Sequence, residues 1–303
     1  MRAPTGSALE RLAGAPISWG VCEVPGWGLM LPRDKVLAEM RELGLKATEL
    51  GALGYLGDEP GQIRSLLSGY SLGAVGGFVP LSLHEPSARD KARSDAEAAA
   101  SLLSGAGGTY FVTAIVVDEA WSEPFDPSPA QWDEIADEVA MVDGICAAHG
   151  LVQVVHPHVG TLVERAEHVG ELMARSAVQW CLDTGHMAIG GLDPVGFARR
   201  HAERVGLVHL KDVDLSQAGP VLAHKVSLLD ATRSGMFRSA GAGDVDITGT
   251  VSTLEAQGYD GWYVLEQDTT IDPGTSVEPG PVDDVKASVE YLRRALATGA
   301  GRR

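Results

Sequence analysis

The stretch VVHPHVGT carries two histidines, His156 and His158, at the end of an otherwise apolar run. In an extended strand, residues i and i+2 point to the same face of the sheet, so both imidazoles face the same way. A strand of this kind offers two groups at once for binding a metal ion or for moving protons. The remaining members of such a site must come from other strands.

Polar side chains follow other apolar runs in the same manner. Charged residues are rare inside parallel strands, because both faces of such strands are buried, so their repeated position at one end needs a common cause. Asp183, His209 and Glu266, from three successive strands, form a mixed nitrogen and oxygen site that suits Mn²⁺, Co²⁺, Fe²⁺ or Zn²⁺. His156 can complete this site. The other polar residues at these ends are Glu49, His158, His186 and Lys211.

Each of these residues also has an ordinary structural explanation. A single histidine on a strand is often a hydrogen-bonded core residue, and Asp183 ahead of TGH can cap the helix that follows. Glu49 can form a salt bridge, and Lys211 can lie at the edge of a solvated loop. The joint pattern, rather than any one residue, favours a shared site.

Short apolar runs alternate with longer amphipathic segments, which is typical of βα units around a parallel sheet. We expect eight strands, at 15–19, 46–51, 72–79, 109–117, 151–158, 178–185, 205–212 and 262–268. Helices with clear start or stop residues are expected at 32–44, 128–150 and 282–297.

Eight such units favour an α/β fold of the (β/α)8 TIM barrel type over an open doubly wound sheet, and no strand leads into a GxGxxG turn. We predict a single domain over 1–303, with an N-terminal extension (about 1–13) and a long loop after the seventh strand (about 213–250). Active sites of TIM barrels lie at the carboxyl ends of the strands, which is where the polar residues are expected.

The formal net charge of −17 gives a surface that repels phosphate backbones, so a small neutral molecule suits this chain better than nucleic acid. Three cysteines without CxxC spacing argue against a disulfide framework and a structural zinc site, and they fit a reducing cytoplasm. We expect neither a secretion signal nor a membrane-spanning segment, because no apolar run is long enough for one. The fold often forms homo-oligomers, and the long loop is a candidate contact with a second copy.

At these residues the sequence resembles the sugar phosphate isomerase/epimerase superfamily of xylose-isomerase-like TIM barrels, and within it the inosose dehydratase branch. LDTGH with HLKD and a glutamate on the last strand is typical of the superfamily, while HPHVGT indicates the inosose dehydratase branch. The matching stretches cover nearly the whole chain: GAPISWG, ATELG, HPHVGTLVE, CLDTGH, HLKD and GYDGWYVLEQD.

The resemblance implies a divalent metal ion at the mouth of the barrel, Mn²⁺ or Co²⁺ first, with Zn²⁺, Fe²⁺ or Mg²⁺ as alternatives. The matching ligands are His156, Asp183, His209 and Glu266. In many sugar epimerases of the superfamily the ligand on the fifth strand is a glutamate, and His156 replaces it here. Epimerisation commonly uses two carboxylates on opposite faces, so the replacement favours dehydration, which needs a base, a metal and an acid.

We therefore expect a metal-dependent carbon–oxygen lyase that removes water from a cyclic 2-keto polyol such as scyllo-inosose. Glu266 or Lys211 can take the proton next to the ketone, and His158 or His186 can deliver one to the departing hydroxyl. The residues alone do not choose between these assignments.

Substrate contacts are expected from His158, His186 and Lys211 at the same rim. Glu49 can bind a hydroxyl group. The ring of Trp19 can stack on the carbon face of the substrate or pack under the barrel rim.

Two related activities remain open on the same scaffold. One is a metal-dependent ketose epimerase or isomerase that uses Glu266 and a histidine, and the other is a lyase that removes a glycosidic group from a 3-keto sugar. A sensor without turnover is disfavoured, because Asp183, His209 and Glu266 are all present. Endonucleases of the superfamily act on DNA through a basic surface, which an acidic chain does not offer.

Overall fold

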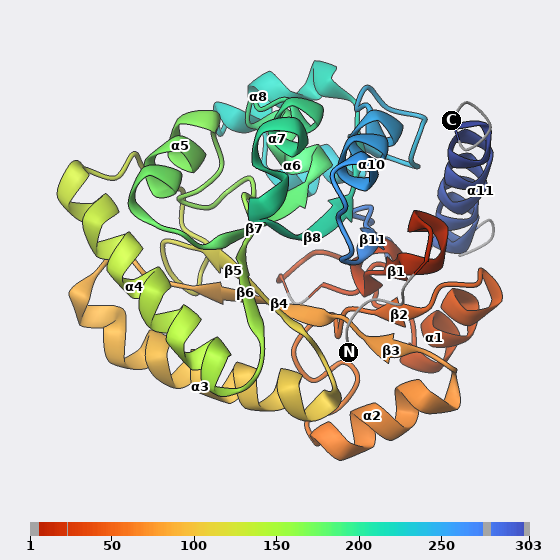
Figure 1. Cartoon of the computed structure of the whole chain (residues 1–303), viewed down its shortest axis with the longest axis horizontal. Coiled ribbons are helices and arrows are strands. Elements are labelled where there is room, and N and C mark those ends of the chain that lie inside the picture. The colour runs from red at the N-terminus through yellow and green to blue at the C-terminus, as the bar shows by residue number, and fades with distance from the viewer. Residues whose placement is uncertain (1–5, 23, 275–279, 300–303) are drawn as a thin grey trace.

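The computed structural model describes residues 6–22, 24–274 and 280–299 and forms a barrel of parallel strands surrounded by helices (Figure 1). Over these residues the barrel sheet has the strand order β3-β2-β1-β11-β8-β7-β6-β5-β4. Its strands are β1 (Leu12–Gly14), β2 (Ala47–Thr48), β3 (Gly73–Ala74), β4 (Gly76–Leu81), β5 (Tyr110–Ile115), β6 (Val152–Val155), β7 (Gln179–Asp183), β8 (Val205–Leu210) and β11 (Tyr263–Leu265).

The barrel closes at Val75, which separates β3 from β4. The amide of Val75 donates to the carbonyl of Thr48 in β2, and the carbonyl of Val75 accepts from the amide of Tyr110 in β5. β3 pairs with β2 and β4 pairs with β5, so the two segments act as one strand with a neighbour on each side. With this strand counted once, the prediction of an eight-stranded TIM barrel is confirmed.

Helices cover the outside of the barrel (Figure 1). They are α1 (Arg33–Glu42), α2 (Pro60–Gly69), α3 (Arg89–Ala106), α4 (Pro129–Ala148), α5 (Ala166–Arg175), α6 (Thr184–Ile189), α7 (Pro194–His201), α10 (Ile247–Ala256) and α11 (Pro281–Gly299). The three predicted helices are confirmed as α1, α4 and α11. The Ser-Pro start of α4 acts as expected, because the Ser128 hydroxyl accepts the amide of Gln131 and Pro129 begins the first turn.

Two apolar layers hold the barrel together. The larger one fills the space between strands and helices. The smaller one fills the barrel interior with mostly small side chains: Ala13, Ala15, Ala47, Val75, Val112, Val154, Cys181, Leu207, Trp262 and Val264. Alternate residues of each strand belong to the two layers, as expected for a sheet buried on both faces.

The first strand lies earlier than predicted. β1 covers Leu12–Gly14, and Pro16–Trp19 forms a 3-10 helix instead of the strand expected at 15–19. Pro16 has no amide hydrogen for a strand ladder and fits the first turn of a helix. The expected N-terminal extension is correspondingly shorter: a 3-10 turn (Ala8–Arg11) precedes β1, and residues 1–5 lie outside the described residues.

The segment expected as a long loop after the seventh strand, 213–250, is folded. β9 (Asp212–Val213) and β10 (Phe237–Arg238) form a small antiparallel sheet, and between them lie a 3-10 turn (Leu215–Gln217), α8 (Ala218–Leu222) and α9 (Leu228–Arg233). Elements this short carry too few residues for a periodic signal in the sequence. No helix in the described part of the chain is long and apolar enough to cross a membrane.

Candidate active site

The candidate site lies one layer above the apolar interior of the barrel. Side chains on one face of a strand repeat every second residue, so a residue two positions after an interior one points the same way. Five residues of the apolar interior are each followed two positions later by a polar residue: Ala47 by Glu49, Val154 by His156, Cys181 by Asp183, Leu207 by His209 and Val264 by Glu266. Two positions further along the chain, after β8 and β11, come Lys211 and Asp268. We call these seven polar residues the floor cluster.

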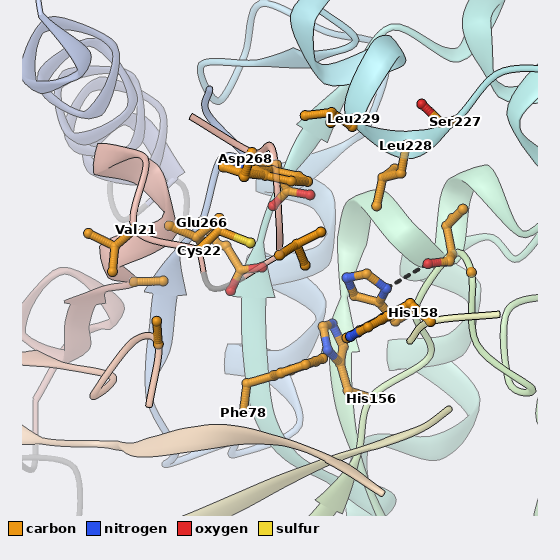
Figure 2. A pocket seen from close by; sticks show the side chains of 18 of the residues that line it. Val21, Cys22, Phe78, His156, His158, Ser227, Leu228, Leu229, Glu266 and Asp268 are labelled. Atoms are coloured by element: carbon orange, nitrogen blue, oxygen red, sulfur yellow. Dashed lines mark hydrogen bonds between the residues drawn. The ribbon is translucent and has the colours of Figure 1, made fainter. Parts of the chain in front are cut away.

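A cavity of about 460 Å³ opens above the floor cluster, a volume suited to a small molecule. Figure 2 shows His156 and His158 on one side of it and Glu266 and Asp268 on another, with Leu228 above. The floor residues that line it are Glu49, His156, His209, Glu266 and Asp268, and aromatic side chains of Trp27, Phe78 and Trp121 form part of its wall.

In both Asp183 and Glu266, one carboxylate oxygen contacts a fixed backbone or lysine group and the other lies next to a histidine of the floor cluster. Oδ1 of Asp183 accepts the amide of His186 at 2.7 Å as the N-cap of α6, and Oδ2 lies 3.2 Å from Nε2 of His156. Oε1 of Glu266 lies 2.7 Å from Nζ of Lys211, and Oε2 lies 2.9 Å from Nδ1 of His209. One oxygen of each carboxylate is thus fixed, while the other faces a histidine.

His209 meets carboxylates at both ring nitrogens. Nε2 forms a 3.1 Å hydrogen bond with Oε1 of Glu49. Burial opposes a charge on the ring, but the effects of Cys181, Glu266 and Glu49 outweigh it and raise the pKa of His209 well above its ordinary value. A metal ion would therefore bind Nδ1 in place of a proton. Glu49 would then hold the ring by its other nitrogen, as carboxylates commonly do for metal-binding histidines.

Lys211 is fully buried, and its ammonium group contacts three carboxylates. Nζ lies 2.7 Å from Glu266, 2.8 Å from Asp268 and 3.5 Å from Asp183, and 2.9 Å from Nε2 of His186. Burial opposes the charge, but Asp183, Asp268 and Glu266 outweigh it and raise the pKa of Lys211 well above its ordinary value. This arrangement favours a fixed cation over a group that takes a proton.

The two carboxylates at the end of the last barrel strand differ in charge state. For Glu266, burial favours the neutral acid, but His209 and Lys211 outweigh burial and lower the pKa below its ordinary value. For Asp268, burial raises the pKa and so does the negative charge of Glu266. Together they outweigh the opposing effect of Lys211, and the pKa is raised to about 6. Asp268 therefore exchanges its proton most readily near neutral pH.

His156, His158 and His186 form a group of neighbouring rings. The ring centroids of His158 and His186 are 3.9 Å apart. Burial lowers the pKa of each ring, to about 3 for His158, where His156 and Lys211 act in the same direction. Nδ1 of His158 donates to the carbonyl of Val159 at 2.7 Å, so Nε2 keeps its lone pair. His158 can accept a hydrogen bond but does not store a proton at neutral pH.

The floor cluster fits a divalent cation. Nδ1 of His209 and Oε2 of Glu266 are 2.9 Å apart, yet Nδ1 has no hydrogen-bond partner among the described residues. Two ligand atoms that flank one cation at right angles, each about 2.1 Å away, are about 3 Å apart. Nδ1 of His209 also lies 3.7 Å from Oδ2 of Asp183, which His156 approaches from the other side. Burial raises the pKa of the Cys181 thiol to about 12, so a thiolate ligand is not expected here.

Phe78 and Trp121 form a stacked pair at the wall of the cavity, with ring centroids 6.1 Å apart, and the ring of His158 lies beside both. The same two residues also line a second cavity of about 730 Å³ between β4 and α3. Both cavities also share Gly51 and Ala52. The aromatic pair is thus the boundary between two neighbouring spaces.

The segment between β9 and β10, residues 214–236, covers the cavity, and we call it the roof segment. Val221, His224, Leu228 and Leu229 of this segment line the cavity. Its attachment depends on Asp212, a buried residue of β9 whose carboxylate accepts the amides of Val213, Gly241, Gly243 and Val245.

The predicted site residues meet in this structure, with three exceptions among the expected substrate contacts. Trp19 is fully buried, and its indole donates to Glu39 at 2.7 Å, so it packs under the rim and does not line the cavity. His186 and Lys211 do not line the cavity either. Glu49 lines it but uses Oε1 to bind His209.

The sequence reasoning missed Asp268, His224 and the aromatic pair. Asp268 follows Glu266 by two residues, so the spacing that indicated His156 and His158 could have found it. Phe78 lies in β4 but is apolar, and His224 and Trp121 lie outside the barrel strands, so none of the three belongs to the pattern of polar strand ends.

Comparisons with known proteins agree with this fold. A family model described as the xylose isomerase-like TIM barrel matches residues 37–295. An inosose dehydratase of Geobacillus kaustophilus (strain HTA426) is 31% identical over 301 residues, which cover 94% of each chain.

Solved structures share the fold at lower identity. L-ribulose 3-epimerase superposes with a TM-score of 0.69 and 17% identity, covering 96% of each chain. The IOLI protein, described with a binding zinc atom, superposes with a TM-score of 0.70 and 11% identity, covering 95% of this chain and 98% of that one.

Proposed function

The chain belongs to the xylose isomerase-like TIM barrel family, as its LDTGH and HLKD motifs predicted, and from this premise we propose that it is a metal-dependent dehydratase acting on a cyclic 2-keto polyol such as scyllo-inosose. The observation that carries the proposal is the unsymmetrical floor cluster. One side has the histidine His156, and the other has two carboxylates, Glu266 and Asp268, bridged by Lys211. The similarity to inosose dehydratases supports the same choice.

The proposed metal ligands are His156, Asp183, His209 and Glu266, with Mn²⁺ or Co²⁺ as the expected ion. A divalent cation held by these residues would supply a positive charge that stabilises the negative charge developing on the substrate when the C–H next to the ketone loses its proton. Glu49 fixes the ring of His209 for this purpose through the hydrogen bond to Nε2.

Asp268 is the proposed proton-transfer group. It lines the cavity, and its pKa of about 6 suits both uptake and release of a proton near neutral pH. Asp268 takes the proton from the carbon next to the ketone and returns a proton to the hydroxyl on the following carbon. That hydroxyl leaves as water, and the remaining enol rearranges to a 1,2-dione. Lys211 holds Asp268 in place through the 2.8 Å contact.

The remaining residues of the cavity bind and orient the ring. Nε2 of His158 is available as an acceptor for a substrate hydroxyl. Phe78 and Trp121 offer aromatic faces to the carbon face of a cyclic polyol. The cavity also limits the access of bulk water to a reactive enol.

The test is to measure the metal content of the purified protein and then its reaction with scyllo-inosose. A dehydratase yields a product that is lighter by one water and absorbs in the ultraviolet, and a chelator stops the reaction until Mn²⁺ or Co²⁺ is restored. A product of unchanged mass would instead identify an epimerase or isomerase, an activity consistent with the structural likeness to L-ribulose 3-epimerase.

The second cavity favours one alternative, a lyase that removes a glycosidic group from a 3-keto sugar. This reaction uses the same proton chemistry with a larger leaving group, and the space behind Phe78 and Trp121 is large enough for one. Release of an alcohol from a 3-keto glycoside, with no reaction of scyllo-inosose, would support this alternative.

A further inference from the structure

His224 is held in an unusual backbone conformation at the end of α8. The amide of His224 bonds the carbonyl of Val221, and the amide of Lys225 bonds the carbonyl of Pro220, which together form a Schellman motif. The φ angle of His224 is 51°, in the left-handed region. Glycine is usual at this position because it has no Cβ to clash with the backbone.

Five other helices of the described chain, α1, α4, α6, α9 and α10, follow the usual rule. The residue after the C-cap is a glycine with positive φ at Gly44, Gly150, Gly191, Gly235 and Gly258. A histidine in the same position carries backbone strain that a glycine would avoid. A function of the imidazole side chain would explain why histidine, and not glycine, occupies position 224.

The side chain of His224 lies between the cavity and the side chain of Glu164. It lines the cavity from the roof segment. Its Nε2 lies 3.3 Å from Oε1 of Glu164, whose side chain is only 2% exposed. Glu164 is itself held by the amide of Gly160 at 3.0 Å and by Nε of Arg165 at 3.2 Å. The buried carboxylate of Glu164, which Gly160 and Arg165 hold at the barrel rim, therefore fixes the position of the His224 ring.

The contact with Glu164 determines which ring nitrogen of His224 can accept a hydrogen bond. A carboxylate oxygen only accepts hydrogen bonds, so its position next to Nε2 favours the tautomer with hydrogen on Nε2. Nδ1 then remains as an acceptor for a hydroxyl hydrogen. The floor cluster acts on the opposite side of the cavity.

We propose that His224 is a substrate-binding residue that accepts a hydrogen bond from a hydroxyl group on the face of the cyclic polyol turned away from the floor cluster. This inference rests on the proposed function for its substrate class. It adds a contact that distinguishes polyols by the position of one hydroxyl, because an acceptor that the bound polyol covers costs binding energy when it is left without its partner.

The chain offers a matched control in Ser71. Ser71 follows the C-cap of α2, has a φ of 59°, and takes part in the same pair of hydrogen bonds, from Ser71 to Ser68 and from Leu72 to Leu67. It is exposed and lies just before β3, at the end of the barrel opposite the cavity. Both Ser71→Gly and His224→Gly relieve the same backbone strain, but only the latter changes the cavity.

The experiment compares wild type, H224G and S71G by thermal unfolding, by turnover of scyllo-inosose and by calorimetric binding of myo-inositol, a cyclic polyol without the ketone. We expect neither variant to lower Tm. H224G should raise KM about tenfold, the effect of one lost hydrogen bond, with a smaller change in kcat, and S71G should keep the wild-type KM. An unchanged KM in H224G would overturn the inference.

Two further outcomes are informative. If H224G lowers Tm, the variant H224N decides, because asparagine accepts the left-handed conformation: a raised KM with wild-type Tm supports the inference, and a wild-type KM overturns it. If the wild type does not convert scyllo-inosose, the proposed function fails, and binding decides. About tenfold weaker binding of myo-inositol by H224G still supports the role of His224, whereas equal binding, or no binding by the wild type, rejects it.

Discussion

The floor cluster and the roof segment face each other across one cavity and are built in opposite ways. The floor uses side chains at the ends of barrel strands, and its charges are almost fully paired, as Lys211 shows with its three carboxylates. The roof uses short helices and presents mostly apolar side chains, such as Val221, Leu228 and Leu229. In the proposed function, the barrel therefore supplies the reacting groups, whereas the roof segment supplies the shape of the cavity.

The largest expected effect tests the paired charges of the floor. Lys211→Met leaves three buried carboxylates without their cation, which should lower the free energy of unfolding by about 3–5 kcal/mol and reduce kcat/KM by about 10³-fold or more. Chemical denaturation and steady-state kinetics measure these effects.

Lys35→Met is the control for this substitution. Lys35 is about half exposed and pairs with Glu39 one turn away in α1, so its loss should cost less than about 0.5 kcal/mol. Equal stability of the two variants would mean that the floor charges are not coupled as described.

Asp183→Asn tests whether the floor binds a metal ion. Asparagine keeps the N-cap of α6 but removes the charge at Oδ2, so the affinity for Mn²⁺ should fall by about 100-fold or more without loss of the fold. Metal analysis after dialysis measures the effect. Asp193→Asn makes the same change at the N-cap of α7, away from the floor cluster, and should retain the metal. Full metal content in D183N would remove Asp183 from the ligand set.

Asp268→Asn separates proton transfer from metal binding. We expect kcat to fall by about 100-fold, with metal content and KM nearly unchanged, because the amide cannot take up or release the proton. The control is Asp260→Asn at the exposed, opposite end of the same strand, which should behave as wild type. Wild-type turnover in D268N would assign the proton to another group.

The smallest effect concerns the cavity rather than its floor. Burial raises the pKa of Cys146 and Cys181 to about 12, whereas Cys22 is half-buried and lines the cavity. At pH 8 a thiol reagent should modify Cys22 first, and a bound polyol should slow this reaction several-fold. Rapid modification of all three thiols in the folded protein would contradict the described burial.

The sequence predicts the floor better than the roof, for a physical reason. Residues of a strand alternate between two faces. An apolar run with a polar residue at its end, as in Leu207 and His209, therefore already predicts the face to which the polar side chain points and its level in the barrel. The same rule applies to Asp268, which follows Glu266 at the same spacing and lies within the strand predicted at 262–268, so the sequence pattern already contained it.

The roof segment gives no comparable signal. α8 has five residues and α9 has six, too few for a helical repeat to stand out. The misplaced first strand has a similar origin, because Pro16 turns the chain into a 3-10 helix directly after β1. Of the two positions expected for Trp19, the indole takes the one under the rim, where it donates to Glu39. Local backbone changes of this kind depend on single residues and not on a repeating pattern.

Lys211 and Asp212 are neighbours in the chain, yet their side chains serve different regions. Lys211 binds the carboxylates of the floor cluster, and Asp212 gathers the amides at which the roof segment rejoins the barrel. Because the two residues are adjacent in the backbone, the position of the ammonium group among the floor carboxylates and the attachment of the roof segment depend on the same short stretch of chain. A substitution that shifts this stretch would disturb both regions together.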